Sequence, residues 1–382
     1  MSDLLSPPSW SQRLFYAVIK VLVRQGSRIA FSEVEIRGMD RVPWDDPCIV
    51  SPNHQNAFLD ALLIGAHTPG KMSYLSRSDI FGTVFDWVLK ALQMVPVYRR
   101  RDGFKKLALN RQIFAAQREN LRRGNSLLIF SEAAHALTYY LRPLSKGSSR
   151  FAIEAQAELD RPVWLVPVGL NYYHHRRPGF KVSMVFGEPI RVADYLNEPE
   201  AAETSSPTVD PRRVNDLRDD LSKAMKTCLL IPEKTAHYDG QVRRVNRYNE
   251  SFSFPELRQR LADGTKLSAA DLERPSLDSV GRIVDVLNAP VAFLVAKMMR
   301  RVEDPVFALS LKFAAGILVL PIWWLLLFLV GWAAGGWIAG FALIIVAATT
   351  LLIRRALIRF SNPPHLLGEK GDEAVHTRQR IS

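Results

Sequence analysis

The feature that most constrains this chain is a run of 41 consecutive residues, Phe313–Ile353, that contains no Asp, Glu, Lys or Arg. A helix needs only about 20 residues to cross the hydrocarbon core of a bilayer, so the run is long enough for two passes. Segments of 18 residues (313–330) and 22 residues (332–353) fit those passes, with glycines in and just after the short connector. The run therefore predicts a transmembrane helical hairpin within residues 305–354.

The charges that flank this run predict its orientation. Basic residues stand at both ends and none at the tip: Lys297, Arg300, Arg301 and Lys312 precede it, and Arg354, Arg355 and Arg359 follow it. Positive charge marks the cytoplasmic side of membrane helices, so we expect both termini and the rest of the chain to face the cytoplasm. The alternative is a buried hairpin in a soluble protein, but soluble helices rarely run this long without a polar face.

Residues 1–31 predict a different relation to the membrane. Lys20 interrupts their apolar run, and no secretory signal is evident. At 100° per residue, Arg13, Lys20, Arg24 and Arg28 share a stripe about 80° wide. Such a helix is typical of the headgroup layer, with apolar side chains at the acyl boundary and cations on anionic lipid. The alternative is that the apolar side packs on the domain core.

Composition bounds the remaining possibilities. A length of 382 residues allows two or three domains, and 48% hydrophobic residues are enough for a sizeable core. Cys48 and Cys228 lie far apart without the spacing of a zinc or redox motif, which predicts neither a disulfide nor a metal site. The net charge of +12 indicates an anionic partner, which is a nucleic acid, a membrane surface or a phosphorylated metabolite.

Residues 32–196 alternate short β-rich runs with helical stretches, which predicts an α/β domain with helices flanking a mostly parallel sheet. The expected strands are 33–37, 48–51, 72–76, 95–98, 127–130, 163–168 and 182–186, and the expected helices are 58–66, 80–92, 105–122 and 148–158. Residues 197–211 are acidic and proline-punctuated, which indicates a linker or loop. We expect a helical region of unknown role over 212–304 and a cytoplasmic tail over 355–382.

The first chemical constellation is Asn53-His54 followed by Asp60, where a predicted strand turns into a helix. In open α/β sheets, sites gather at the carboxyl ends of strands. An imidazole titrates near neutrality, and a neighbouring carboxylate fixes its tautomer and stabilises the imidazolium. His54 and Asp60 are therefore candidates for a general base and its orienting partner, although a lone histidine and aspartate are often structural.

A second strand end carries Arg99, and residues 99–123 hold nine Lys or Arg against two acidic residues, a local charge of +7. Arginine is well shaped for bidentate contact with phosphate, which makes Arg99 a candidate phosphate ligand. Most of the other cations in this segment are expected to cover a solvated helix face. A third strand ends at Phe130-Ser131-Glu132, and a fourth contains Val166-Pro167-Val168.

In this order, the four segments resemble the glycerophospholipid acyltransferase family, which includes lysophosphatidate and glycerol-3-phosphate acyltransferases. The resemblance spans roughly residues 45–190. It implies that His54 is the base, that Asp60 orients it, and that Arg99 binds the phosphate of the acceptor. The third block of the family usually reads Phe-Pro-Glu-Gly-Thr-Arg, and here Phe130–His135 retains only the Phe and the Glu.

Two departures from the family pattern carry information. Five residues separate His54 from Asp60 where the common spacing is four, and the longer spacing resembles the branch that acylates glycerol 3-phosphate and dihydroxyacetone phosphate. In the third block, Ala133 replaces the glycine and His135 replaces the arginine. The resemblance still implies that Glu132 binds substrate, and Arg142 and Lys146 are candidates to supply the missing charge.

The implied reaction moves an acyl group from a thioester of coenzyme A or acyl carrier protein to a hydroxyl of a phosphorylated glycerol. It needs no metal and no cofactor besides the acyl donor. Glycerol 3-phosphate is the expected acceptor and lysophosphatidate the second. Membrane lipid is an expected partner and nucleic acid is not, because nucleic-acid binding leaves the apolar run and the strand-end residues unexplained.

Two readings from other classes remain open. A lipid-binding protein that has lost catalysis agrees with the altered third block. A metal hydrolase that uses His174 and His175 is the other, but adjacent histidines in a loop do not easily reach one ion. We expect those two histidines to lie on the surface near the membrane.

Overall fold

The computed structural model describes residues 9–83, 86–99, 102–196, 210–247, 252–263 and 278–360. Most of the expected linker at 197–211 and most of the expected tail at 355–382 therefore lie outside the described residues.

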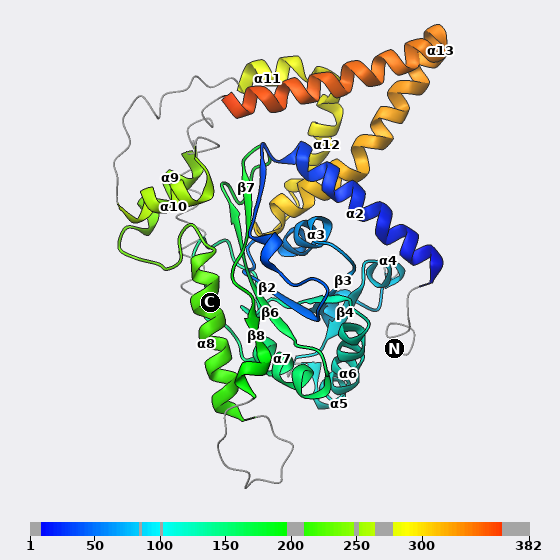
Figure 1. Cartoon of the computed structure of the whole chain (residues 1–382). Helices are drawn as coiled ribbons and strands as arrows, with labels where there is room; N and C mark the ends of the chain where they lie inside the picture. Colours follow the sequence, from blue (N-terminus) through cyan, green and yellow to red (C-terminus); the bar gives the residue numbers. More distant parts are fainter. Residues whose placement is uncertain are drawn as a thin grey trace.

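A mostly parallel sheet forms the centre of the fold (Figure 1). Its strands are β1 (Val34–Arg37), β2 (Cys48–Pro52), β3 (Met72–Arg77), β4 (Met94–Val97), β5 (Ser126–Leu128), β6 (Trp164–Tyr172), β7 (Val182–Phe186) and β8 (Ile190–Arg191). The order is β1-β7-β6-β2-β5-β3-β4, with β8 paired to β6; only β6 pairs in the antiparallel sense, with β7 and β8. The predicted α/β class is confirmed. Because β2, β3, β4 and β5 are mutually parallel, their carboxyl ends meet at one edge.

Helices cover both faces of this sheet. The helices nearest to β2–β5 in the chain are α3 (Ala57–His67), α4 (Asp86–Ala91), α5 (Phe104–Leu107), α6 (Leu109–Arg122) and α7 (Gly147–Glu158). Successive strand residues alternate between two hydrophobic clusters: Ile49 packs with residues of α6, α7 and α8, whereas Val50 packs with residues of α2, α3 and α13. This alternation follows from the two-residue period of a strand and places the core in two layers.

Beyond the sheet, the chain continues in helices α8 (Pro211–Thr227), α9 (Tyr238–Arg247), α10 (Phe254–Ala262), α11 (Asp278–Val284) and α12 (Ala289–Met299). Helix α8 packs on α7 and β6 and contributes to the second core layer. Helices α9 and α10 form a third hydrophobic cluster against β7 and the loop that precedes β7. The helical character expected for this region is present, but the region is not one unit, because α11 and α12 pack instead on α13.

The N-terminal helix α2 (Trp10–Ala30) lies against α3 and α13 (Figure 1). Tyr16 and Val23 are buried against the domain. Trp10 is 77% exposed, and the outward side also carries Leu14, Val18, Val21, Leu22 and Ile29. This row is called the α2 apolar stripe below. The alternative that the apolar side packs on the core therefore holds in part, for residues such as Val23 and Ile19, and not for the exposed stripe.

The expected placement of the α2 cations on lipid is also wrong for two of them. The Nζ of Lys20 donates to the carbonyls of Thr68 and Gly70, each at 2.7 Å, and the Nε of Arg24 donates to the carbonyl of Ala66 at 2.9 Å. These carbonyls belong to the C-terminal end of α3 or follow it, where unpaired carbonyl groups and the helix dipole attract positive charge. Lys20 and Arg24 therefore fix α2 to the α/β domain.

The C-terminal element α13 (Phe307–Phe360) consists of two helical arms that meet at Gly335 and Gly336. Gly336 has a φ of 80°, which a glycine adopts without the steric cost of a Cβ. The arms leave the domain, reach an apex and turn back, as Figure 1 shows in orange and red. The expected hairpin is present, and its turn lies at Gly335 and Gly336, two of the glycines in and just after the expected connector.

The hairpin is apolar and exposed over most of its length. Residues 307–354 have a mean hydropathy of 2.5 in their most apolar stretch, of which only 11% is buried within the protein. The core helix of a soluble protein is buried on most sides, so the exposure of Leu318, Ile322 and Ile345 argues against that alternative. By length and composition, this is the one element of the described residues that is able to cross a membrane.

Candidate active site

His54 and Asp60 meet at the carboxyl end of β2. The Nδ1 of His54 lies 2.8 Å from Oδ2 of Asp60. Asp60 is fully buried, and its carboxylate also accepts the N–H groups of Gln55 and Asn56 and the hydroxyl of Tyr172. The two amides and the hydroxyl all donate to the Asp60 carboxylate, and an ionised carboxylate is only an acceptor. Nδ1 of His54 is therefore the donor in its bond to Asp60, so the proton of the neutral imidazole sits on Nδ1. The other ring nitrogen, Nε2, is then the basic one.

The extra residue between His54 and Asp60 is absorbed before the first turn of α3. Asn56 has φ −131° and ψ 53°, and Ala57 follows with a left-handed φ of 45°. This bend lets the loop close so that Asp60, in the first turn of α3, reaches back to the amides of residues 55 and 56. The longer spacing is therefore compatible with a paired histidine and aspartate.

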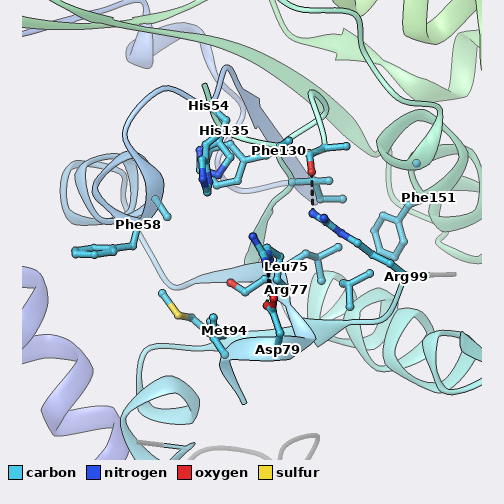
Figure 2. A pocket seen from close by; sticks show the side chains of 18 of the residues that line it. His54, Phe58, Leu75, Arg77, Asp79, Met94, Arg99, Phe130, His135 and Phe151 are labelled. Carbon is cyan, nitrogen blue, oxygen red and sulfur yellow. Dashed lines mark hydrogen bonds and ion pairs between the residues drawn. The ribbon is translucent and has the colours of Figure 1, made fainter. Parts of the chain in front are cut away.

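The ring of His54 is held from both sides. Its face stacks on Phe130 with ring centroids 3.7 Å apart and planes 13° apart, and His135 contacts it edge-on at 5.4 Å (Figure 2). Burial lowers the pKa of His135, and the positive charge that His54 gains on protonation lowers it further. His135 is therefore mostly neutral at pH 7, unlike the arginine that the third block of the family carries.

Glu132 lies in the loop after β5 and supports the loop that carries His54. Its two carboxylate oxygens accept the backbone N–H groups of His54, at 2.8 Å, and of Arg142, at 2.7 Å. Burial raises the pKa of Glu132, and the two amide bonds oppose that rise. The resemblance assigns Glu132 to substrate, but in this geometry its carboxylate is engaged by the backbone and holds the His54 loop to the loop after β5.

Ala133 takes the position at which the family's third block has glycine, and its φ is 62°. An L-residue in the left-handed region costs roughly 1–2 kcal/mol, because its Cβ crowds the following carbonyl. The conformation is kept because the carbonyl of Ala133 accepts the Nη2 of Arg99 at 2.9 Å. Ala133 thus adopts a backbone conformation that favours glycine.

Replacing Ala133 with glycine is expected to stabilise the protein by about 1 kcal/mol, because glycine adopts a positive φ without this cost. A rise of a few degrees in the midpoint of thermal unfolding would show the gain. Ala134, which has no positive φ, is the matched control, and Ala134→Gly is expected to be neutral or destabilising. Equal destabilisation by both substitutions would contradict the strain at Ala133.

The site opens into a cavity of about 970 Å³. Its positively charged lining consists of Arg77, Arg99, Lys146 and Arg150, and its apolar lining includes Phe58, Ile80, Met94, Phe114, Phe130, Phe151 and Phe307. Figure 2 shows His54 and His135 on one side of this space and Arg99 on the other. The cavity therefore offers cationic groups and an extended apolar wall to the same ligand.

Of the three expected cationic residues Arg99, Arg142 and Lys146, two line this cavity and one does not. Arg99 and Lys146 line it. The Nη1 of Arg142 donates to the carbonyl of Ala134 at 3.0 Å, and its backbone N–H is taken by Glu132. Arg142 thus braces the third loop, whereas Arg99 and Lys146 are placed to meet a ligand.

Sequence reasoning missed Arg77, Asp79 and Tyr172. Arg77 ends β3 and lines the cavity, where its Nε donates to Oδ1 of Asp79 at 3.0 Å, and this carboxylate raises its pKa. The signal that identified Arg99, an arginine at the end of a parallel strand, also applies to Arg77. Tyr172, at the carboxyl end of β6, gives Asp60 its fourth hydrogen bond at 2.7 Å.

The expected surface position of His174 and His175 is wrong. His175 is buried and its Nε2 lies 2.9 Å from Oε1 of Gln55, while the ring of His174 packs on Phe180. Burial lowers the pKa of each histidine to about 3. Within the described residues, no group of three or more His, Cys, Asp or Glu is arranged to hold a metal ion.

A protein-family model matches the part of the chain that contains this site. Residues 33–171 match the family model described as Acyltransferase. That segment contains the paired His54 and Asp60, the strand-end cations and most of the sheet, so the matched part of the chain is the part that carries the candidate site.

The comparison with curated proteins gives no match. Among solved structures, the 1-acyl-sn-glycerophosphate (LPA) acyltransferase PlsC from Thermotoga maritima is similar at 18% sequence identity and a TM-score of 0.41. That likeness covers 57% of this chain and 79% of the other.

Proposed function

We propose that this chain is a membrane-bound O-acyltransferase that moves a fatty acyl group from a thioester to a hydroxyl of a phosphorylated glycerol. One observation carries the proposal: His54 is fixed by Asp60 through Nδ1 at the edge of a cavity with both cationic and apolar lining. That arrangement suits a general base for an acceptor with a phosphate and a donor with a long hydrocarbon chain.

The proposed reaction has two linked parts. The Nε2 of His54 removes a proton from the acceptor hydroxyl as its oxygen attacks the thioester carbonyl, forming the C–O bond. The C–S bond then breaks, and the imidazolium returns the proton to the leaving thiolate. Asp60 stabilises the imidazolium between these steps. Neither part requires a metal or an enzyme-bound acyl group, and the acyl thioester is the only co-substrate.

The cavity lining suggests where each substrate binds. Arg99 holds the carbonyl of Ala133 with one terminal nitrogen, which leaves its other N–H groups for a phosphate. Lys146 and Arg77 line the same space and add positive charge. The phenylalanines and Met94 form an apolar wall for the acyl chain. We therefore assign the phosphorylated acceptor to the cationic side and the acyl donor to the apolar side.

The membrane assignment rests on exposed apolar surface. The two arms of α13 present apolar side chains that the protein does not cover, and the α2 apolar stripe adds a second such surface. Contiguous exposed apolar surface on this scale is typical of a membrane contact. We propose that α13 is embedded in the bilayer, that α2 lies in the interface, and that the catalytic domain and both termini are cytoplasmic.

Glycerol 3-phosphate is the proposed acceptor, with lysophosphatidate as the second candidate, because the five-residue spacing from His54 to Asp60 matches the branch that acylates glycerol 3-phosphate and dihydroxyacetone phosphate. The purified full chain in vesicles should therefore acylate glycerol 3-phosphate in preference to lysophosphatidate when both compete for one acyl thioester. A strong preference for lysophosphatidate would reverse the order of these acceptors, while leaving the acyltransferase assignment intact.

A further inference from the structure

The first turn of the membrane hairpin reaches the loop that carries the catalytic pair. Ser310, near the start of α13, is fully buried against the N-terminus of α3. Its hydroxyl donates to the carbonyl of Asn56 and accepts the N–H of Leu59 at 3.3 Å. Leu59 is the third residue of α3, and its N–H is one of the groups that an N-cap side chain usually satisfies. This N–H also donates to the carbonyl of Asn56 at 3.0 Å, so Ser310 bonds both partners of that first-turn bond.

Helix α3 does not provide this cap itself. Asn56 occupies the N-cap position, a place where asparagine normally bonds an amide of the first turn, yet its side chain makes no capping bond. Both of its side-chain polar atoms are buried without a hydrogen-bond partner among the described residues. The left-handed φ of Ala57 accompanies this unusual helix start. Ser310, more than 250 residues away along the chain, therefore supplies the cap that Asn56 does not.

The capped turn is also the one that positions the proposed base. Asp60 lies in it and bonds Nδ1 of His54 as well as the amides of residues 55 and 56. Any shift of this turn moves the Asp60 carboxylate and, with it, the His54 ring. We infer that Ser310 is a positioning residue for catalysis, which caps α3 from the membrane hairpin and thereby holds His54 and Asp60 in register.

Two residues near Ser310 also link the base of the hairpin to the active site. The ring of Phe307 lines the cavity and contacts the ring of His135 at 5.3 Å. Asp304, just before α13, lies 3.8 Å from the Nε2 of His135. The base of the hairpin therefore forms part of the cavity wall. It follows that the hairpin completes the active site in addition to anchoring it.

This inference rests on the proposed acyl transfer, and its test uses the full chain in vesicles. Ser310→Ala removes both hydrogen bonds and leaves a side chain of similar size. We expect kcat to fall about ten-fold or more, because misplacement of a reacting group by about 1 Å is able to cost 10²-fold. The KM values for acceptor and donor are expected to stay within about two-fold, since Ser310 does not line the cavity.

Two further variants separate positioning from general destabilisation. Ser310→Thr keeps the hydroxyl and should recover most of kcat. Ser149→Ala removes another fully buried hydroxyl, one that has no partner among the described residues, and should leave kcat unchanged. Wild-type kcat in Ser310→Ala, or equal losses in Ser310→Ala and Ser149→Ala, would overturn the inference while the wild-type activity stands. Absence of acyl transfer by the wild type would instead remove the proposed function.

Discussion

Replacing His54 with alanine is expected to lower kcat for acyl transfer by about 10³-fold. A positioned general base contributes typically about 10²–10⁴-fold, and here the ring is fixed by Asp60, by the stack on Phe130 and by its backbone bond to Glu132. The KM of the acceptor should change much less, because the phosphate is bound by other residues. Steady-state kinetics with a labelled acyl thioester would measure both constants.

His237→Ala is the matched control for this substitution. His237 is exposed on the loop before α9 and does not line the cavity, so its loss should leave kcat unchanged. Retention of wild-type activity by His54→Ala would sink the general-base role, whatever the fold of the variant.

Replacing Arg99 with alanine is expected to raise the acceptor KM by about ten- to a hundred-fold, with a much smaller effect on the donor KM. The guanidinium lines the cavity, and charge-assisted bonds to a phosphate are the strong class of hydrogen bond. A modest fall in kcat should accompany this change, because Arg99 also holds the carbonyl of Ala133 at 2.9 Å. Separate titrations of acceptor and donor would resolve these effects.

Arg99→Lys distinguishes the shape of the side chain from its charge. A lysine does not offer the planar fork of donors that bonds a carbonyl and a phosphate at once, so we expect only partial recovery of the acceptor KM. Arg111→Ala, an exposed change in the same basic segment, should have little effect. Equal increases of the acceptor and donor KM in Arg99→Ala would count against a phosphate site.

The sheet and the positions of the strand-end residues were predictable because they depend on local pattern. Short apolar runs separated by helical stretches predict a parallel sheet, and parallel strands bring their carboxyl ends to one edge. His54, Arg99 and Glu132 were found by that rule, and Arg77 obeys it as well. Boundaries were less accurate: within the expected helix at 80–92, the described α-helical residues are Asp86–Ala91. The carboxylate of Asp86 accepts the amides of Gly82 and Thr83.

Contacts between distant parts of the chain were not predictable. A helical wheel groups Lys20 and Arg24 with the other α2 cations, but it does not reveal that the carbonyls after α3 compete with lipid for them. The side chain of Ser310 gives no sign in the sequence that it caps α3. Glu132 was recognised as a family residue, yet its bonds to two backbone amides depend on how the loops meet.

In the altered third block, the residue replacements are visible in the sequence, but their structural consequences are visible only in the folded protein. The sequence shows that Ala133 and His135 replace a glycine and an arginine, which raises the question of whether catalysis survives. In the folded protein, Ala133 adopts the left-handed conformation that suits a glycine, and Glu132 still supports the His54 loop. The loop therefore keeps a support for His54, although the permanent positive charge of the block is absent at His135.

We propose that the cavity beside His54 transfers an acyl group to a phosphorylated glycerol. The most direct measurement places the purified full chain in phospholipid vesicles with a radiolabelled acyl thioester and glycerol 3-phosphate, with His54→Ala prepared in parallel. We predict that the wild type forms labelled acylglycerol phosphate and that the variant forms at most about a thousandth as much per unit time. Vesicle binding without ester formation from glycerol 3-phosphate, dihydroxyacetone phosphate or lysophosphatidate would contradict the claim and identify a lipid-binding protein without catalysis.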